Sequence, residues 1–356
     1  MDDLIGTPDI SVIVPARNEE ACLADCLRTL VGQAGPSYEI IVVDDHSTDR
    51  TRTIAESFAV RVVAADALPA GWSGKCNAAW SGARVAKGKW LLFTDADTKH
   101  TADSIARGWQ EAQENAADLL SYSPKQEVRT VAERALMPLI FAELAATYPP
   151  KEVSDTASPI AAANGQYLLI KREVYDAIGG HAAVATTILE DVELAKLVKR
   201  AGYKLRFRLS DVVSTRMYRS FPQMWEGWTK NLALLFPNAR GLALRRMFEF
   251  AITVGSVSLA VVLWKKGDRF GCILSGAVAL DRLYFFWRRI CRAHFNWLSN
   301  VLAFFGLPVF SLLLVNSSIS HKRGSVRWKG RQYGSAPSLV TPAAIAGEHG
   351  LPNPEV

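Results

Sequence analysis

Cysteine is scarce in this sequence, and the few cysteines form no recognisable pattern. There are five, an odd number, and none has the paired spacing of a metal site. That usage is typical of a reducing compartment and of ordinary buried thiols, not of a disulfide framework. Cys22 and Cys26 lie four residues apart on a predicted helix, where we expect them to be packing residues.

The start of the chain lacks the features of a secretory signal peptide. Residues 1–10 contain neither a basic segment nor an apolar core. We therefore expect no signal peptide and a cytoplasmic N-terminal domain.

Basic charge is present but unevenly spread. The 356 residues carry a net charge of +6 and are enough for one large or two ordinary domains. Lys and Arg are concentrated after Arg240, whereas the acidic residues of interest lie before Glu193. The basic half is also apolar and rich in Trp and Phe, so the sequence predicts contact with a membrane and no binding of nucleic acid.

Strands and helices alternate in the first part of the chain, as in a doubly wound, mostly parallel sheet of the α/β class. We expect Asn18 to cap the first helix, with Glu19 and Glu20 in its first turn. Strands are predicted at 10–15, 39–43, 60–64 and 90–93, and helices at 16–30, 50–58 and 76–86.

Polar side chains follow the second and third strands. Asp44 and Asp45 end the second strand, where acceptor side chains could hold the base and ribose of a nucleotide, although Ser47 or Asp49 can also cap the next helix. After the third strand, glycines permit close approach of the backbone, and Lys75 supplies a cation for a phosphate.

Two carboxylates follow the strand at 90–93, which is apolar throughout. Asp95 and Asp97 are separated by one residue, so both can face one site at the carboxyl end of the strand. Hard oxygen ligands there suit Mg²⁺ or Mn²⁺ bridging phosphates. The alternative is a solvated turn after a strand.

The pattern continues to residue 201 with a further acidic pair. Glu190 and Asp191 head a helix that continues through 192–201, where acidic residues can also simply stabilise the helix dipole. Before them we predict helices at 102–115 and 172–178, strands at 119–123 and 162–170, and a helix followed by a loop between 130 and 159.

Four elements in this order resemble glycosyltransferase family 2, the inverting GT-A enzymes that use nucleotide-diphosphate sugars. The resemblance extends from Ser11 to Trp228, and the segments that carry it are 12–19, 42–49, 94–97 and 190–191. A Rossmann-like GT-A fold is implied, with a nucleotide-diphosphate sugar, a UDP-sugar by expectation, as donor.

The resemblance also implies roles for individual residues. Pro15, Arg17, Glu19 and Asp45 would line the nucleotide pocket, with Asp44 beside them. Asp95 would lie nearer the ribose and, with Asp97, would hold the metal, while Asp191 would be the catalytic base, with Glu190 as the other candidate. The cation and Lys75 would stabilise the leaving diphosphate, and an inverting displacement needs a carboxylate on the opposite face.

The acceptor region departs from the processive members of the family. The strict Gln-x-x-Arg-Trp motif is absent from 217–231, which argues against a polysaccharide synthase. Trp225 and Trp228 would share a helix face suited to a sugar, a lipid or the membrane interface, and Arg219 lies close by in the chain. Segments 71–75 and 178–181 resemble the membrane-bound branch associated with carotenoid and hopanoid pathways. His181 could contact the acceptor or be a structural histidine.

Three apolar segments follow, at 248–264, 270–287 and 297–319, with basic and aromatic residues at their ends. The middle one contains Asp281 and Arg282, so it is either a span with a buried ion pair or a re-entrant element. A soluble helical bundle is the alternative for all three. We expect an even number of crossings, with the middle segment the doubtful one.

The predicted organisation is a catalytic domain over 1–235, a membrane region over 236–320 and a basic cytoplasmic tail over 321–356. Within the first, 10–125 would bind the nucleotide sugar and 126–235 would supply the acceptor site and the base. The tail would return toward the catalytic domain, and we expect disorder from about Ser335.

Together these features predict a multi-pass cell-membrane enzyme that transfers a sugar to a lipid acceptor, favouring the carotenoid or hopanoid type. A polyprenyl-phosphate glycosyltransferase and a membrane scaffold that binds a nucleotide sugar without turnover are the alternatives.

Overall fold

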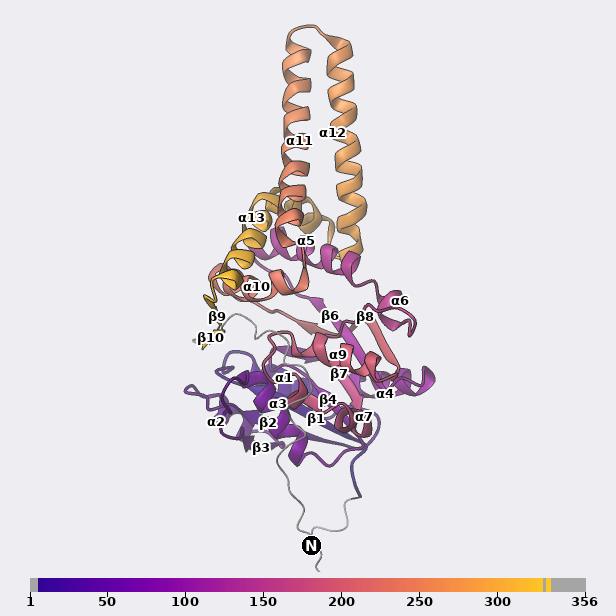
Figure 1. Ribbon diagram of the computed structural model, residues 1–356, viewed down its shortest axis with the longest axis vertical. Helices are drawn as coiled ribbons and strands as arrows, with labels where there is room; N and C mark the ends of the chain where they lie inside the picture. The colour runs from indigo at the N-terminus through magenta and orange to yellow at the C-terminus, as the bar shows by residue number, and fades with distance from the viewer. Residues whose placement is uncertain (1–5, 329–330, 334–356) are drawn as a thin grey trace, which may run out of the picture.

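A mixed sheet of eight strands forms the centre of the part before the long apolar helices in this computed structural model, which describes residues 6–328 and 331–333 (Figure 1). The strand order is β3-β2-β1-β4-β7-β6-β8-β5. The strands are β1 Ile10–Ala16, β2 Tyr38–Asp44, β3 Arg61–Ala64, β4 Trp90–Phe93, β5 Thr98–His100, β6 Leu119–Gln126, β7 Leu168–Lys171 and β8 Leu205–Thr215.

Helices cover both faces of this sheet because alternate residues of its strands point to opposite sides. Val12 and Val14 of β1 belong to the core under α1 and α4, whereas Ile13 belongs to the core under α3 and α9. The helices up to the membrane region are α1 Leu23–Leu30, α2 Thr51–Glu56, α3 Gly74–Val85, α4 Ser104–Glu114, α5 Val131–Thr147, α6 Pro150–Ser154, α7 Arg172–Ala177, α8 Gly180–Ala183, α9 Glu190–Arg200 and α10 Phe221–Leu235.

The sheet is more mixed than a simple doubly wound pattern. Among the described residues the strands form parallel pairs β1–β2, β2–β3, β1–β4 and β6–β8, and antiparallel pairs β4–β7, β6–β7 and β5–β8. The predicted α/β, Rossmann-like class is confirmed, and three of these four parallel pairs, β1–β2, β2–β3 and β1–β4, lie in the N-terminal part that the sequence pattern described.

The prediction of a helix from residue 16 is wrong. β1 continues through Ala16, and α1 begins only at Leu23, with Cys22 as its N-cap residue. Asn18 has a φ of +52°, and its Oδ1 accepts a hydrogen bond from the Thr48 N–H at 2.9 Å. Asparagine tolerates this left-handed conformation, so residues 17–22 form a loop that bends toward β2 instead of a helical turn.

The predicted strand at 162–170 is too long at its start. Only Leu168–Lys171 pairs with β4 and β6, and residues 161–167 form a loop that leads into β7. Strands β5 and β8 were not predicted, and the pairing of Thr98–His100 with residues 213–215 closes this end of the sheet.

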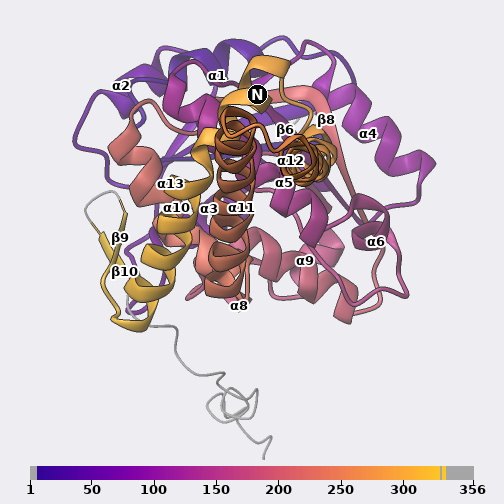
Figure 2. The same cartoon turned by 90° about the horizontal axis from the view of Figure 1, so that it is seen from above.

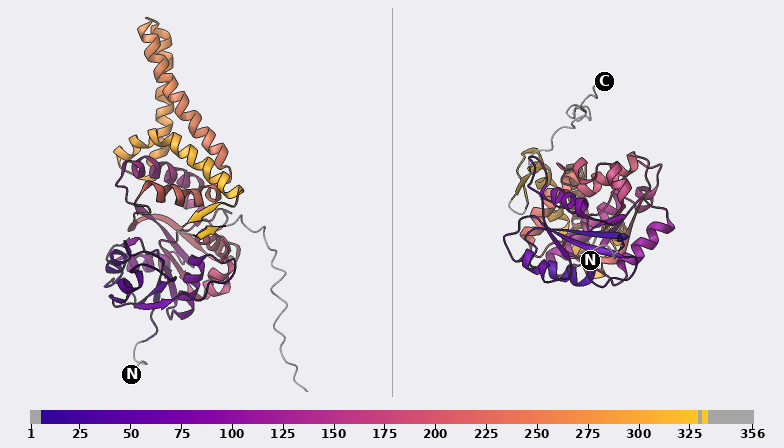
Figure 3. Two further views of the ribbon diagram at one scale, coloured as in Figure 1. Left: turned by 90° about the vertical axis from the view of Figure 1, so that its left-hand side faces the viewer. Right: turned by 90° about the horizontal axis from the view of Figure 1, so that it is seen from below.

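Helices α11 Ala239–Lys265 and α12 Arg269–Ile290 form an antiparallel hairpin that projects from the rest of the molecule (Figures 1 and 2). Helix α13, Trp297–Lys322, lies across the base of the hairpin and packs on α5 and α10 (Figure 3). All three are long and apolar enough to cross a membrane. Their most apolar windows differ in burial: 6% for α11, 11% for α12 and 50% for α13.

The middle segment is one continuous helix, α12. Asp281 and Arg282 form an ion pair with each other on the surface of this helix, where both side chains are exposed in the isolated chain. Whether the segment crosses the membrane stays a prediction.

The chain after α13 turns back toward α10, as expected. β9, Val326–Trp328, lies against α10 and pairs with β10, Arg331–Tyr333. The disorder expected from Ser335 falls outside the described residues.

Candidate active site

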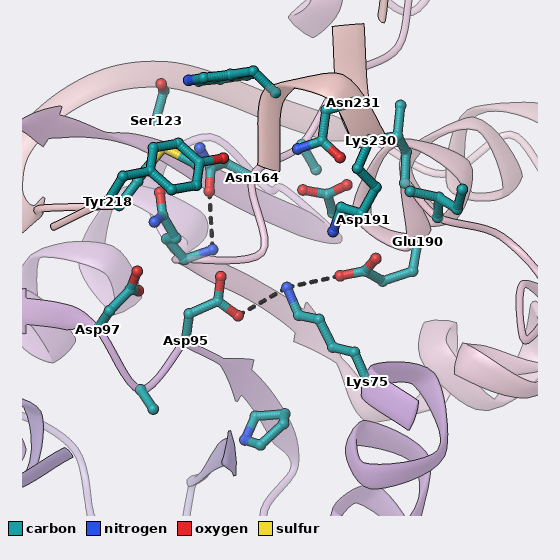
Figure 4. Close-up of a pocket in the computed structure, with 18 of the residues that line it drawn as sticks. Lys75, Asp95, Asp97, Ser123, Asn164, Glu190, Asp191, Tyr218, Lys230 and Asn231 are labelled. Carbon is teal, nitrogen blue, oxygen red and sulfur yellow. Dashed lines mark hydrogen bonds and ion pairs between the residues drawn. The ribbon is translucent and has the colours of Figure 1, made fainter. Parts of the chain in front are cut away.

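A cavity of about 620 Å³ lies between the carboxyl ends of β1 and β4 and helices α5 and α10. Most of the residues singled out in the sequence line it. These are Pro15, Arg17, Glu19, Asp45, Lys75, Asp95, Asp97, Glu190, Asp191, Arg219 and Trp228. Segments distant in the sequence therefore converge on one site (Figure 4).

The ends of β1 and β2 form one side of this cavity. Arg17 Nη1 lies 3.6 Å from Asp45 Oδ2 and donates a hydrogen bond to the Asp45 carbonyl at 3.3 Å. Asp44 is directed into its own turn, where Oδ1 accepts from the Ser47 N–H at 3.1 Å. It does not line the cavity. Asp44 thus supports the turn behind Asp45.

The loop that carries Asp95 and Asp97 is fixed by buried hydrogen bonds from neighbouring elements. The Thr94 hydroxyl donates to the Gln166 carbonyl at 2.8 Å and lies 3.0 Å from His100 Nε2. Thr215 Oγ1 donates to the Asp97 carbonyl at 3.3 Å. Burial lowers the pKa of His100 to about 3, so this support stays neutral at physiological pH.

Lys75 connects the aspartate loop to the acidic pair on α9. Its Nζ lies 2.8 Å from Asp95 Oδ1 and 2.8 Å from Glu190 Oε1 (Figure 4). The Ser73 side chain caps α3 by accepting from the Cys76 N–H, which sets the start of the helix that carries Lys75. Burial would lower the pKa of Lys75, but Asp95, Glu190 and Asp191 hold it well above its usual range.

Asp191 and Glu190 are adjacent carboxylates with opposite pKa shifts. Burial and then the Glu190 charge raise the pKa of Asp191 to about 6, while Lys75 works against them. Burial also raises the pKa of Glu190, but Lys75 outweighs it and the net pKa is lowered. Environments that separate two carboxyl groups in this way are typical of acid–base sites.

The Asp191 carboxylate is held by backbone groups at the start of α9. Oδ2 accepts from the Gly165 N–H at 2.9 Å, and Oδ1 accepts from the Val192 N–H at 2.8 Å. A Cβ at Gly165 would lie 3.0 Å from Lys75 Nζ and 3.7 Å from Asp191 Oδ2, so glycine permits the close approach of the loop, Lys75 and Asp191.

Two of the predicted acceptor residues do not line the large cavity. His181 is buried behind Phe93 and Lys75, and its Nδ1 lies 2.9 Å from the Tyr175 hydroxyl. Burial lowers its pKa to about 4, which agrees with a structural histidine. Trp225 packs on Phe221 along α10. Of the two tryptophans that were expected to share a helix face, only Trp228 lines the cavity.

Several cavity residues were missed by the sequence reasoning. Lys230 and Asn231 come from α10, and Asn164 comes from the loop before β7 (Figure 4). The Asn164–Gly165 dipeptide is a turn signal that could have separated this loop from the predicted strand. A single lysine in an apolar helix gives no comparable signal.

The donor set fits a divalent cation that is shared with phosphates. Asp95 and Asp97 provide hard oxygen ligands at one wall of the cavity. Within residues 6–328 and 331–333, His, Cys, Asp and Glu form no group of three or more that could hold a metal by itself. Mg²⁺ and Mn²⁺ are commonly bound through one or two carboxylates plus substrate phosphates, so the residues present fit such an ion.

Comparisons with known proteins show which family this chain resembles. The sequence model described as glycosyl transferase family 2 matches residues 11–179. The 4,4'-diaponeurosporenoate glycosyltransferase of Staphylococcus haemolyticus is 31% identical over 341 residues, which cover 92% of this chain and 89% of that protein. The Staphylococcus aureus (strain USA300) protein of the same name is 26% identical, with 91% and 88% covered.

Two solved structures are similar at lower identity. A mannosyltransferase from Pyrobaculum calidifontis, in complex with GDP-Man and Mn²⁺, has a TM-score of 0.49 and 17% identity, covering 88% of this chain and 86% of its own. The glucosyl-3-phosphoglycerate synthase of Mycobacterium tuberculosis, in complex with Mn²⁺ and UDP, has a TM-score of 0.43 and 20% identity, with 64% and 78% covered.

The fold and the charged cavity are those of a glycosyltransferase, and this chain is an enzyme of that class. It belongs to glycosyl transferase family 2, as the sequence motifs predicted.

Proposed function

We propose that this enzyme transfers a sugar, with inversion, from a nucleotide-diphosphate sugar to a lipid of the carotenoid or hopanoid type, at the membrane. A UDP-sugar is the expected donor. The observation that carries the proposal is the composition of a single cavity, which joins the charged residues at the strand ends to an apolar wall supplied by α5 and α10. The names of the staphylococcal relatives support a polyene acid as acceptor.

The helix that supplies part of the apolar wall, α5, also packs against the apolar C-terminal helices. Phe141 and Leu144 of α5, Tyr148 directly after it, and Leu235 of α10 line the cavity. On its other side α5 packs against α13, where a Cβ on Gly306 would lie 2.3 Å from the Ala135 carbonyl oxygen. A long apolar acceptor could thus lie along α5 with its polar end at Asp191.

Each charged residue then has a defined task. Arg17 and Lys75 lie where cations favour the leaving diphosphate, and Asp95 and Asp97 would hold Mg²⁺ or Mn²⁺. When bound, the metal supplies Lewis-acid stabilisation of the negative charge on the diphosphate. Asp191 accepts the proton of the acceptor as the acceptor oxygen attacks the anomeric carbon from the face opposite the diphosphate.

The arrangement of the helices supports a position in the cell membrane. We propose that α11 and α12 cross the bilayer as a hairpin, so the catalytic domain, over 1–235, and the start of α13 lie on the same, cytoplasmic side. α11 has 27 residues and is therefore about 40 Å long, which is enough to cross. α13, half-buried on α5 and α10, would lie at the membrane surface.

Turnover by the full-length protein in detergent tests the proposal. Nucleotide sugars would be offered with total membrane lipids, and with Mg²⁺, Mn²⁺ or EDTA. We expect metal-dependent release of nucleotide and entry of labelled sugar into a lipid. A product that is acid-labile and yields a polyprenyl phosphate would instead identify a polyprenyl-phosphate glycosyltransferase. Donor binding without release, whatever the lipid, would contradict the enzymatic role in lipid glycosylation.

A further inference from the structure

A second lysine, Lys230, enters the catalytic cavity from the side of the apolar wall. It comes from α10, and Figure 4 shows its side chain directed toward Asp191 and Lys75. Its main-chain carbonyl lies 2.8 Å from His321 Nε2 of α13, which fixes the helix at this point. The sequence reasoning assigned no role to this residue.

The two lysines of the cavity have different surroundings. Lys75 lies within 2.8 Å of both Asp95 and Glu190, between the aspartate loop and α9. Lys230 is carried by the helix that also supplies Trp228 and Leu235 to the apolar part. The two lysines thus come from different sides, Lys75 from α3 and Lys230 from the helix of the apolar wall, and their side chains meet near Asp191.

The surroundings of Lys230 favour an additional anion. Burial and the charge of Lys75 lower the pKa of Lys230, and the charges of Glu190, Asp95 and Asp191 only partly oppose this. An ammonium at this depth is stabilised by an anion that is brought beside it. The indole N–H of Trp228 is also buried, and it has no acceptor among the residues that the structure describes. The α10 helix therefore brings one cation and that hydrogen-bond donor to this side of the cavity.

We infer that Lys230 binds the carboxylate of a lipid acid and selects acids over alcohols with the same chain. The inference rests on the proposed function, since it concerns the acceptor of that reaction. Without Lys230, the carboxylate that forms when the acid gives up its proton would lie near Asp95 and Glu190, which already share Lys75.

The transfer step balances with this assignment. The acid gives its proton to Asp191, and Lys230 binds the carboxylate that remains. One carboxylate oxygen forms a bond to the anomeric carbon, while the bond from that carbon to the diphosphate breaks and the nucleotide diphosphate leaves with the electron pair. The proton of a carboxylic acid also suits a base as weak as Asp191 better than that of an alcohol does.

Binding and turnover of a matched pair of acceptors test the inference. A polyene acid and the primary alcohol of the same chain would be titrated into full-length protein in detergent, with binding followed by polyene absorbance. Lys230→Met is expected to weaken acid binding at least about tenfold and to change alcohol binding by less than about twofold. Lys230→Arg should restore much of the acid binding. Lys196→Met, on the outer surface of α9, is the control.

Each result decides one point. Equal acid binding by wild type and Lys230→Met, or a change confined to the KM of the nucleotide sugar, would overturn the role of Lys230. If wild type transfers sugar to lipid but binds the acid no more tightly than Lys230→Met does, the proposed function stands and the inference falls. If wild type transfers no sugar but binds the acid through Lys230, the inference stands and the proposed function falls.

Discussion

Asp191 combines features that a general base near neutral pH requires. Backbone N–H groups fix both of its oxygens, and burial brings its pKa to about 6. Asn keeps the shape but cannot accept the proton. Asp191→Asn should reduce transfer by at least about 10²-fold and leave donor binding nearly unchanged.

Labelled sugar in lipid and donor titration would measure these two effects. Asp176→Asn, on the exposed side of α7, is the control. Near-normal turnover by Asp191→Asn would remove this residue from the base role.

The same carboxylate gives the reaction an acidic limb. Asp191 accepts a proton only when ionised, so the rate should rise as pH increases through about 6. Glu190 raises this pKa, whereas Lys75 lowers it, and Lys230 also faces the pair. Glu190→Gln removes the raising charge, so the limb should move to lower pH.

Rates from pH 4.5 to 8 at saturating substrates would show the limb. An unchanged limb in Glu190→Gln would mean that another group titrates.

At the scale of elements, the sequence pattern was informative where a strand is apolar on both faces. β4 was predicted with its observed bounds, and the carboxylates after it lie at the expected edge. β8 was missed because Arg206, Arg208 and Asp211 interrupt its apolar pattern, and its pairing with β6 joins segments about 85 residues apart.

The site shows the same limit. Asp95, Asp97 and Asp191 could be found because they stand at recognisable strand and helix ends. Lys230 could not, because its role arises from where α10 packs. Nor does the sequence show that His181 faces Tyr175 and not the cavity, since the direction of its side chain depends on how α8 packs in the fold.

The contact between α13 and α5 should be sensitive to one added methyl group. A Cβ at Gly306 would lie 2.3 Å from the Ala135 carbonyl oxygen, which belongs to a helix backbone and cannot easily move. Gly306→Ala should destabilise the protein by about 1–3 kcal/mol. Gly255→Ala in α11, where nothing lies within 4 Å, should have little effect.

Thermal unfolding in detergent, followed by tryptophan fluorescence, would compare the two variants. Equal midpoints would show that α13 does not pack on α5 as described.

At the scale of the whole molecule, four charged side chains, each at most 15% exposed, join the hairpin to the rest of the protein. Glu143 of α5 accepts from Arg246 of α11 at 2.7 Å, and Glu249 of α11 accepts from Arg289 of α12 at 2.9 Å. Glu143→Gln leaves buried arginine charge poorly compensated and should cost about 3–5 kcal/mol of stability.

The unfolding midpoint would again be measured, at low and high salt. Burial should make the loss insensitive to salt. Glu173→Gln, an exposed change on α7, is the control, and a loss no larger than this one would argue against a structural role for the four charges.

In the proposed topology both ends of the hairpin lie on the cytoplasmic side of the bilayer, and the loop between α11 and α12 lies on the other side. A thiol introduced by Lys266→Cys in a Cys272→Ser background should react with an impermeant maleimide in intact cells. The natural Cys291, exposed at the end of α12, should react only after the membrane is opened. Labelling of Cys291 in intact cells would exclude this topology.

The position of the α5 and α10 wall next to the apolar C-terminal helices also decides which measure of acceptor concentration applies to the reaction. An acceptor that never leaves the bilayer meets the enzyme in two dimensions, so its mole fraction among the lipids replaces its molarity. Adding inert lipid to the same vesicles should slow the reaction, whereas diluting those vesicles with buffer should not. The enzyme would therefore respond to the composition of its membrane, and only its sugar donor would be drawn from the volume of the cell.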